Sequence, residues 1–168
     1  MIDVETTGLS PGLGNRVIEI GAVAIEKKSI LDEFHSLINV RKRIPMSAQL
    51  VHGITDEMLI GKPGPSEVFP KFREFIRGSI LVAHNAHFDI SFLMHEFRLL
   101  GLTLENDFHC TLEMSRERYP RLRNHKLETV YRHVCARNRA DATRCTQSHR
   151  ALGDARMVAE IWMEMMRR

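Results

Sequence analysis

The apolar run over residues 16–26 constrains the fold most, because Val, Ile and Ala dominate a stretch long enough for a strand. This composition predicts a buried strand. Residues 30–40 follow with polar side chains interleaved among apolar ones, which predicts a second strand. Residues 1–5 and 80–83 are two further strand-like segments. A sheet therefore forms the centre of the expected fold.

Helix-like segments follow the strands. Ser66 is expected to cap a helix with apolar residues on one face, and Gly101 is placed to end another. The element order β-β-β-α-β-α-β-α-α predicts an α/β fold with a mixed sheet. The expected helices cover residues 66–76, 88–100, 127–134 and 148 to the end of the chain.

The bulk properties are those of one soluble domain. A length of 168 residues predicts a single domain over 1–168, and 43% apolar with 27% charged residues is ordinary for a globular protein. No apolar run reaches transmembrane length and no signal peptide is visible, so we expect a cytoplasmic protein without membrane contact. The first strand is short, which leaves open whether the native chain extends upstream of Met1.

The net charge and the cysteine content say little about the functional class of the protein. A net charge of +3 is compatible with a polyanionic partner without requiring one. The three cysteines lack C-x-x-C spacing and are expected to be reduced thiols.

Carboxylates occur at three informative places. Asp3 and Glu5 are two residues apart on a strand, so both side chains point to the same face and repel each other unless a cation lies between them. Asp89 follows an apolar strand at the start of a helix, and Asp154 lies among the apolar residues of the last helix. His149 precedes Asp154 by five residues and is expected at the helix entry. Taken singly, each of these residues also fits an ordinary structural role.

Taken together, these residues resemble the three motifs of the DEDDh (DnaQ-like) 3′→5′ exonucleases. Residues 3–8 (DVETTG) resemble the first motif and residues 85–89 (NAHFD) the second. His149-x-x-x-x-Asp154 resembles the third motif, and Arg150 stands where the sister subgroup has tyrosine. The likeness covers the whole chain. It is greatest to the proofreading epsilon subunits of bacterial replicative polymerases.

The resemblance implies a fold, a metal centre and a mechanism. The implied fold is RNase H-like, with a five-stranded mixed sheet flanked by helices. Asp3, Glu5, Asp89 and Asp154 would bind two Mg²⁺ or Mn²⁺ ions, which activate water and stabilise the leaving 3′ oxygen. His149 would be the general base, because neutral histidine can accept a proton near neutral pH.

Nucleotide contacts are also implied by the resemblance. The turn after the first strand would hold the terminal nucleotide, and Leu9 would wedge between the last two bases. Phe88 fits a core position equally well. A zinc site built from His84, His87, His109 and Cys110 is disfavoured, because hard carboxylate ligands are available. The implied nucleotide-contacting residues are Thr6, Thr7, Gly8, Leu9, His52, Asn85 and Phe88.

The expected function is hydrolysis of single-stranded DNA from its 3′ end, for proofreading or repair. The partner is a single-stranded nucleic acid 3′ end, and a DNA polymerase subunit is a further candidate. An exoribonuclease of the RNase T or oligoribonuclease type is the alternative with the same chemistry. A non-catalytic nucleic-acid-binding module is the alternative from another class. It is disfavoured because all five chemical positions are filled.

Overall fold

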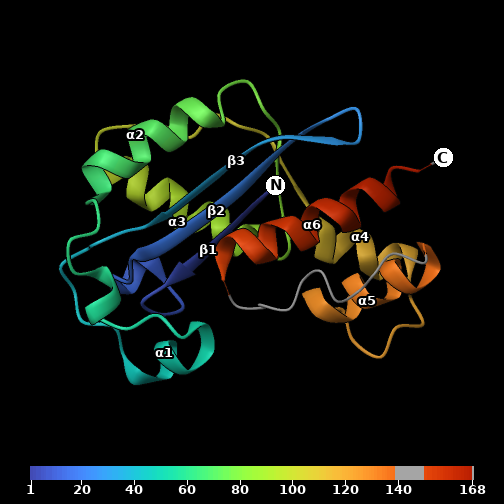
Figure 1. Ribbon diagram of the computed structural model, residues 1–168, viewed down its shortest axis with the longest axis horizontal. Coiled ribbons are helices and arrows are strands. Elements are labelled where there is room, and N and C mark those ends of the chain that lie inside the picture. Colours follow the sequence, from blue (N-terminus) through green and yellow to red (C-terminus); the bar gives the residue numbers. More distant parts are fainter. Residues whose placement is uncertain (139–149, 168) are drawn as a thin grey trace.

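A computed structural model describes residues 1–138 and 150–167 (Figure 1). Five strands and six α-helices make up the described chain, and short 3-10 helices cover Pro11–Leu13 and Glu57–Leu59. The strands are β1 (Ile2–Thr6), β2 (Val17–Glu26), β3 (Ser29–Leu37), β4 (Leu81–Ala83) and β5 (Phe108–Cys110). The helices are α1 (Met46–His52), α2 (Pro65–Phe75), α3 (Ala86–Leu99), α4 (Thr111–Arg118), α5 (Leu127–Asn138) and α6 (Ala151–Met165).

The first three strands form an antiparallel sheet in the order β1-β2-β3. Asp3 pairs with Gly21 and Glu5 pairs with Glu19, so the acidic end of β1 lies against the first half of β2. The register shifts between Glu5 and Thr6, which ends regular pairing where the chain enters the next turn. The buried strand expected over residues 16–26 is confirmed as β2, whose first seven residues are buried.

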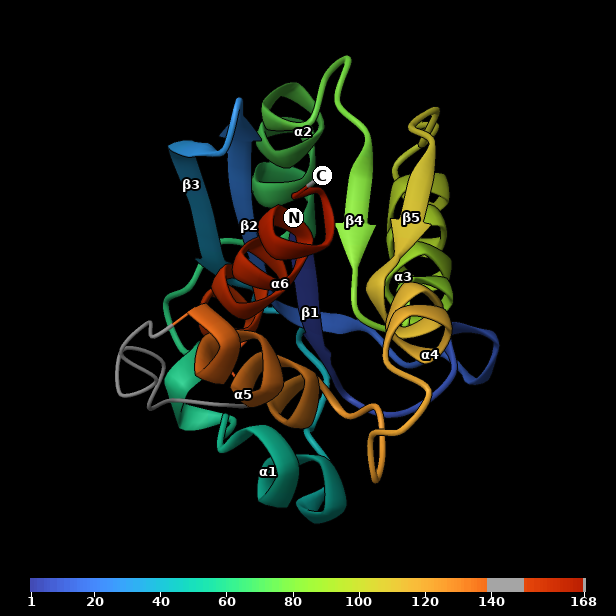
Figure 2. The same cartoon turned by 90° about the vertical axis from the view of Figure 1, so that its right-hand side faces the viewer.

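The other two strands form a separate parallel pair, β4-β5. The expected single five-stranded sheet is therefore found as two hydrogen-bonded groups, although β4 lies beside β1 (Figure 2). The backbone N–H of Val4 explains part of this division. It donates to the carboxylate of Asp89 at 3.0 Å and is thus not available for a strand partner.

Helices cover both faces of the sheet (Figure 2). The main core lies on the face covered by α2 and α3, where Phe72 and Phe97 pack with Ile2 and Val4 of β1. On the opposite face, α6 packs its alanines against Val23 of β2. Side chains alternate along a strand, so the residues of β1 between the core positions point toward α6.

Several expected boundaries differ from the structure. The helix expected to start at Ser66 begins at Pro65 with Gly64 as its N-cap, because proline suits the first helical position and Glu67 accepts the N–H of Gly64 at 3.1 Å. The short helix α1 was not expected, although Pro45 and Gly53 bracket it. Gly101, with φ of 67°, ends α3 as expected.

Two further expectations concern cysteines and membranes. Cys110 is a free, buried thiol, whereas the side chains of Cys135 and Cys145 lie outside the described residues. Among the described helices, none is long and apolar enough to cross a bilayer.

Candidate active site

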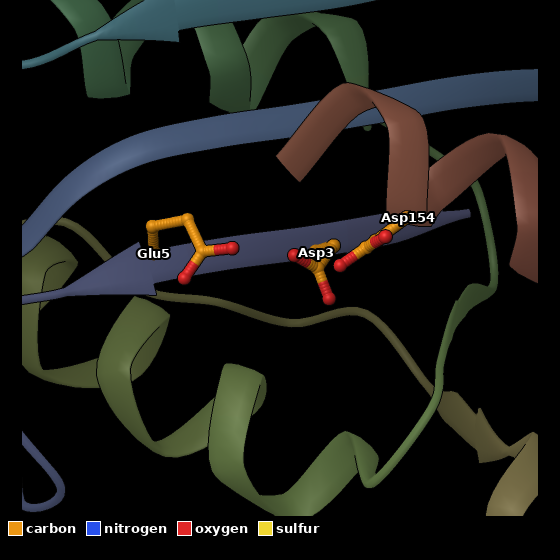
Figure 3. Close-up of side chains that lie close together, drawn as sticks. All are labelled: Asp3, Glu5 and Asp154. Carbon is orange, nitrogen blue, oxygen red and sulfur yellow. The ribbon is translucent and has the colours of Figure 1, made fainter. Parts of the chain in front are cut away.

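Asp3 and Glu5 share one face of β1 because side chains alternate along the strand. Ile2, Val4 and Thr6 are buried, whereas Asp3 and Glu5 between them are only partly buried. The carboxylates therefore leave the apolar core to Ile2 and Val4 and lie near Asp154 of α6 (Figure 3).

Asp154 meets these two carboxylates from the first turn of α6. One carboxylate oxygen from each of Asp3, Glu5 and Asp154 lies within 4.8 Å of the others. Figure 3 shows Asp154 reaching from the helix toward Asp3, with Glu5 further along the strand. Three acids separated by up to 151 positions in the sequence thus share one small volume.

Asp89 reaches the same strand from the first turn of α3. It is buried, and its Oδ1 accepts the N–H of Val4, the residue between Asp3 and Glu5. The structure therefore brings all four predicted acids to one part of β1: three in a compact group and Asp89 at the neighbouring backbone position.

Burial and mutual repulsion make the acids of β1 hard to ionise. Burial raises the pKa of Asp3 well above its ordinary value, and the charges of Asp89, Glu5, Asp154 and Glu19 raise it further. Burial likewise raises the pKa of Glu5 to about 8, with the same kind of repulsion added. A site that penalises its own negative charge is one that a cation stabilises.

Asp89 behaves similarly. Burial raises its pKa to about 8 although the hydrogen bond from Val4 opposes the shift, and the charge of Asp154 adds to the rise. All four groups offer oxygen ligands, which suit hard cations such as Mg²⁺ or Mn²⁺. The donor set and its uncompensated charge therefore fit divalent cations.

Glu19 is an acid of the opposite kind, and the sequence interpretation did not single it out. Burial alone would raise the pKa of Glu19, but hydrogen bonds from His35, Arg150 and the N–H of Ala151 together lower it to about 2. The pKa of Glu19 is thus lowered, whereas that of its neighbour Glu5 is raised. Its position within an apolar run was a usable signal, because a buried charge requires partners.

The predicted nucleotide-contacting turn follows β1 directly. The hydroxyl of Thr6 donates to the carbonyl of Gly8 at 2.7 Å, and that of Thr7 accepts the N–H of Arg16 at 3.0 Å. A Cβ at Gly8 would lie 2.7 Å from the side chain of Asn15, so a larger residue at this position would displace that side chain. Leu9 is 87% exposed at the tip of this turn.

The other predicted contact residues have different environments. His52 is buried at the end of α1, and its Nδ1 accepts the N–H of Ile54 at 3.0 Å. Asn85 is exposed and adopts φ of 72° at the N-cap of α3. Phe88 packs on Phe92 with ring centroids 4.9 Å apart, as the core alternative expected. Contact of these residues with a nucleotide stays a prediction.

Two sequence hypotheses involve histidines. His149, the expected general base, lies outside the described residues. Of the residues considered for zinc, His84 contacts Thr111 and the carbonyl of His125, and His109 stacks on Trp162.

A family comparison agrees with this geometry. The family model described as Exonuclease (RNase_T) matches residues 1–162. The chain belongs to this exonuclease family. The likeness to the DEDDh exonucleases stated from the sequence is thereby confirmed.

Named relatives extend the comparison. The chain is 39% identical over 173 residues to the DNA polymerase III subunit epsilon of Rickettsia conorii, covering 99% of the chain and 72% of that subunit. It is 42% identical over 168 residues to the PolC-type DNA polymerase III of Caldanaerobacter subterraneus subsp. tengcongensis. That match covers 99% of the chain but only 11% of the much longer polymerase. The expected likeness to epsilon subunits is confirmed.

A solved exonuclease supports the fold. Exonuclease X, in a complex with 5′ overhanging duplex DNA, superposes with a TM-score of 0.76 at 25% identity, covering 98% of the chain and 89% of that protein. The α/β, RNase H-like exonuclease fold is thus common to both.

Proposed function

We propose that residues 1–168 form a single 3′→5′ exonuclease domain that hydrolyses phosphodiester bonds at single-stranded DNA ends. The observation that carries this proposal is the convergence of Asp3, Glu5 and Asp154, with Asp89 beside them, in a chain of the exonuclease family. A non-catalytic module would not need buried acids that repel one another at this cost to stability.

Asp3, Glu5, Asp89 and Asp154 are proposed to hold two divalent cations, Mg²⁺ or Mn²⁺. The bound cations would supply Lewis-acid activation of the attacking water and stabilisation of the leaving 3′ oxygen. The acids contribute by fixing the cations against β1 in a partly buried site, where water screens their charge less than it does at an open surface.

His149 is proposed as the general base that accepts the proton of the attacking water. Support comes from its chemistry and its place in the sequence. Histidine is the side chain whose ordinary pKa suits proton transfer near neutral pH. It directly precedes Arg150, the N-cap residue of α6, and α6 carries Asp154 in its first turn.

We propose DNA rather than RNA as the substrate. Relatives of the chain are named as DNA polymerase components, and exonuclease X was solved with DNA. The exposed Leu9 and the glycine turn beside it are proposed to engage the terminal bases. Association with a replicative polymerase, and hence a cytoplasmic location, belongs to the same proposal.

Digestion of 5′-labelled oligonucleotides tests this function. We expect a ladder of fragments shortened from the 3′ end in Mg²⁺ or Mn²⁺ and none in EDTA. A phosphorothioate linkage at the 3′ terminus should slow the digestion. Matched DNA and RNA strands report the sugar preference. Faster cleavage of RNA than of DNA would favour the exoribonuclease alternative.

Matched acid substitutions control for contaminating nucleases. Asp154→Asn removes one of the converging carboxylates, whereas Asp32→Asn removes an exposed acid of β3. The first variant should be inactive and the second should cut like the wild type. Digestion by Asp154→Asn at the wild-type rate would refute the site.

A further inference from the structure

An ion pair between a buried carboxylate and a partly exposed guanidinium joins β2 to the start of α6. The side chain of Glu19 is fully buried, and its Oε1 accepts a hydrogen bond from Nη2 of Arg150 at 2.7 Å. Nε of Arg150 approaches Oε2 at 3.1 Å, so the contact is bidentate. His35 of β3 contacts the same carboxylate at 2.7 Å. Three elements therefore meet at one carboxylate.

The same carboxylate caps the helix. Arg150 is the N-cap residue of α6, and its own side chain makes no capping hydrogen bond. Oε2 of Glu19 instead accepts the N–H of Ala151 at 3.1 Å. A helix N-terminus leaves N–H groups without intrahelical partners, and a carboxylate is a strong acceptor for them. Glu19, a residue of the sheet, thus provides the capping acceptor that the N-cap side chain of α6 does not provide.

A backbone contact beside this carboxylate makes the docking tight. A Cβ at Gly21 would lie 2.3 Å from the backbone N of Leu152 and 2.4 Å from the carbonyl carbon of Ala151. Glu19 and Gly21 are two residues apart on β2 and so face the same side of the sheet. Backbone packing and the carboxylate therefore hold the same turn of α6.

That turn carries Asp154. The N–H of Asp154 donates to the carbonyl of Arg150 at 3.0 Å, so the two residues are linked within one helical turn. In the sheet, Gly21 pairs with Asp3 and Glu19 pairs with Glu5. The residues that hold α6 are thus the strand partners of the residues that Asp154 must meet.

The energetics of this ion pair favour a positioning role over a contribution to stability alone. Burying the carboxylate of Glu19 carries a desolvation cost that its attraction to Arg150 has to offset, so the pair adds little net stability compared with apolar residues. It does fix geometry, because the bidentate contact has one good arrangement. Partners outside a metal's ligand set are known to orient the ligands in this way.

We propose that Glu19 and Arg150 are positioning residues that set the first turn of α6 so that Asp154 completes a metal site with Asp3 and Glu5. This inference rests on the proposed function. It adds two residues that touch neither metal nor substrate but determine how tightly the metal is held.

The sign of one charge change separates positioning from simple electrostatics. Arg150→Met removes a positive charge close to the acids, which by electrostatics alone would tighten the binding of a cation. Loss of positioning would weaken it instead. Mn²⁺ binding, measured by the paramagnetic resonance of free Mn²⁺ in the absence of nucleic acid, reports the outcome without requiring activity.

We expect Arg150→Met to weaken Mn²⁺ binding by about 10- to 100-fold, the usual effect of altering groups that orient metal ligands. Arg150→Lys keeps the charge but not the bidentate contact, so its Mn²⁺ affinity should lie between those of Arg150→Met and the wild type. In nuclease assays of Arg150→Met at subsaturating Mn²⁺, we expect a large fall in kcat. The rise in KM for the oligonucleotide should be smaller.

Two other ion pairs serve as controls. Arg156→Met breaks the pair with Glu33, which also joins α6 to the sheet but is exposed. Glu96→Gln disturbs the ion pair between the fully buried carboxylate of Glu96 on α3 and Arg16, whose Nε lies 2.8 Å from Oε1 of Glu96. Neither variant should change Mn²⁺ affinity, although Glu96→Gln should lower the free energy of unfolding.

Several results would overturn the inference. Unchanged or tighter Mn²⁺ binding by Arg150→Met would do so, and so would equal weakening in Arg156→Met or Glu96→Gln. If Arg150→Met does not fold, wild-type affinity in Arg150→Lys would overturn it equally. Absence of Mn²⁺ binding and cleavage in the wild type would instead refute the proposed function itself.

Discussion

Oδ1 of Asp89 accepts the backbone N–H of Val4 at 3.0 Å, which ties the first turn of α3 to the middle of β1. Val4 separates Asp3 from Glu5, so this one contact sets Asp89 beside both. The same contact occupies the N–H that faces β4. The contact therefore brings Asp89 to the acids of β1 and leaves the N–H of Val4 unavailable to β4.

Substitutions of Asp89 should separate its role in holding α3 against β1 from its proposed role as a metal ligand. Asp89→Asn keeps an oxygen acceptor for the N–H of Val4 but removes the charge, so we expect a folded protein without nuclease activity. Asp89→Leu leaves that buried N–H without an acceptor and should cost about 1–3 kcal/mol more. Urea unfolding in EDTA measures the difference. Equal stability of the two variants would mean that the contact does not hold α3 to β1.

Loss of a metal-site acid should affect cleavage far more than binding. Asp3→Ala or Asp154→Ala should abolish hydrolysis because the cations lose a ligand. Binding of single-stranded DNA should largely persist, since exposed apolar and backbone groups contribute to it independently. Fluorescence anisotropy and product analysis on the same samples make the comparison. Wild-type cleavage rates in both variants would contradict the assignment of these ligands.

The metal-free protein should lose stability as pH rises. The pKa values of Glu5 and Asp89 are raised to about 8 in the folded protein, whereas an unfolded chain ionises such groups near pH 4. Between these values the folded state binds more protons than the unfolded state. The free energy of unfolding therefore falls from about pH 4 to about pH 8.

Unfolding curves in EDTA across this pH range test the expected slope. Saturating Mg²⁺ should flatten it, because a bound cation removes the penalty for ionisation. Asp89→Asn should also reduce it. A metal-free protein that becomes more stable between pH 5 and pH 8 would contradict the expectation.

His149→Ala should lower kcat by about 10²–10⁴-fold, the usual contribution of a general base. Mn²⁺ affinity should change little, because the ligands are carboxylates. The wild-type rate should rise with pH as a histidine loses its proton, which ordinarily happens at a pKa of about 6.5, and the variant should lack this rise. Parallel loss of metal binding and activity would make His149 a ligand instead.

The sequence predicted which acids form the site, but not the contacts that hold those acids in place. Asp3, Glu5 and Asp154 could be grouped because their spacing matches known motifs. The contact between Glu19 and Arg150 joins positions 131 apart in the sequence, and no local pattern specifies such a partner. The charge within a buried strand indicated only that some partner exists.

The same limit applies to the sheet. Strands over residues 1–5, 16–26, 30–40 and 80–83 could be expected from apolar segments. No local pattern shows how the strands divide into two groups, or that Asp89 accepts the N–H of Val4, 85 positions away. Helix α1 was missed because its seven residues are too few to show a clear helical period. Periodicity predicts elements, whereas side-chain contacts between distant elements decide how they join.

The position of Asp154 on α6, the last helix of the described chain, has a consequence for biosynthesis. Ribosomes release a protein from its N-terminus onward, so β1 and α3 emerge with three acids while α6 is still within the exit tunnel. A nascent chain at that stage lacks the fourth carboxylate and the arginine that holds its helix in place. The metal site would therefore be complete only after residues 150–154 have left the exit tunnel, later than the strand and the helix that carry the other three acids.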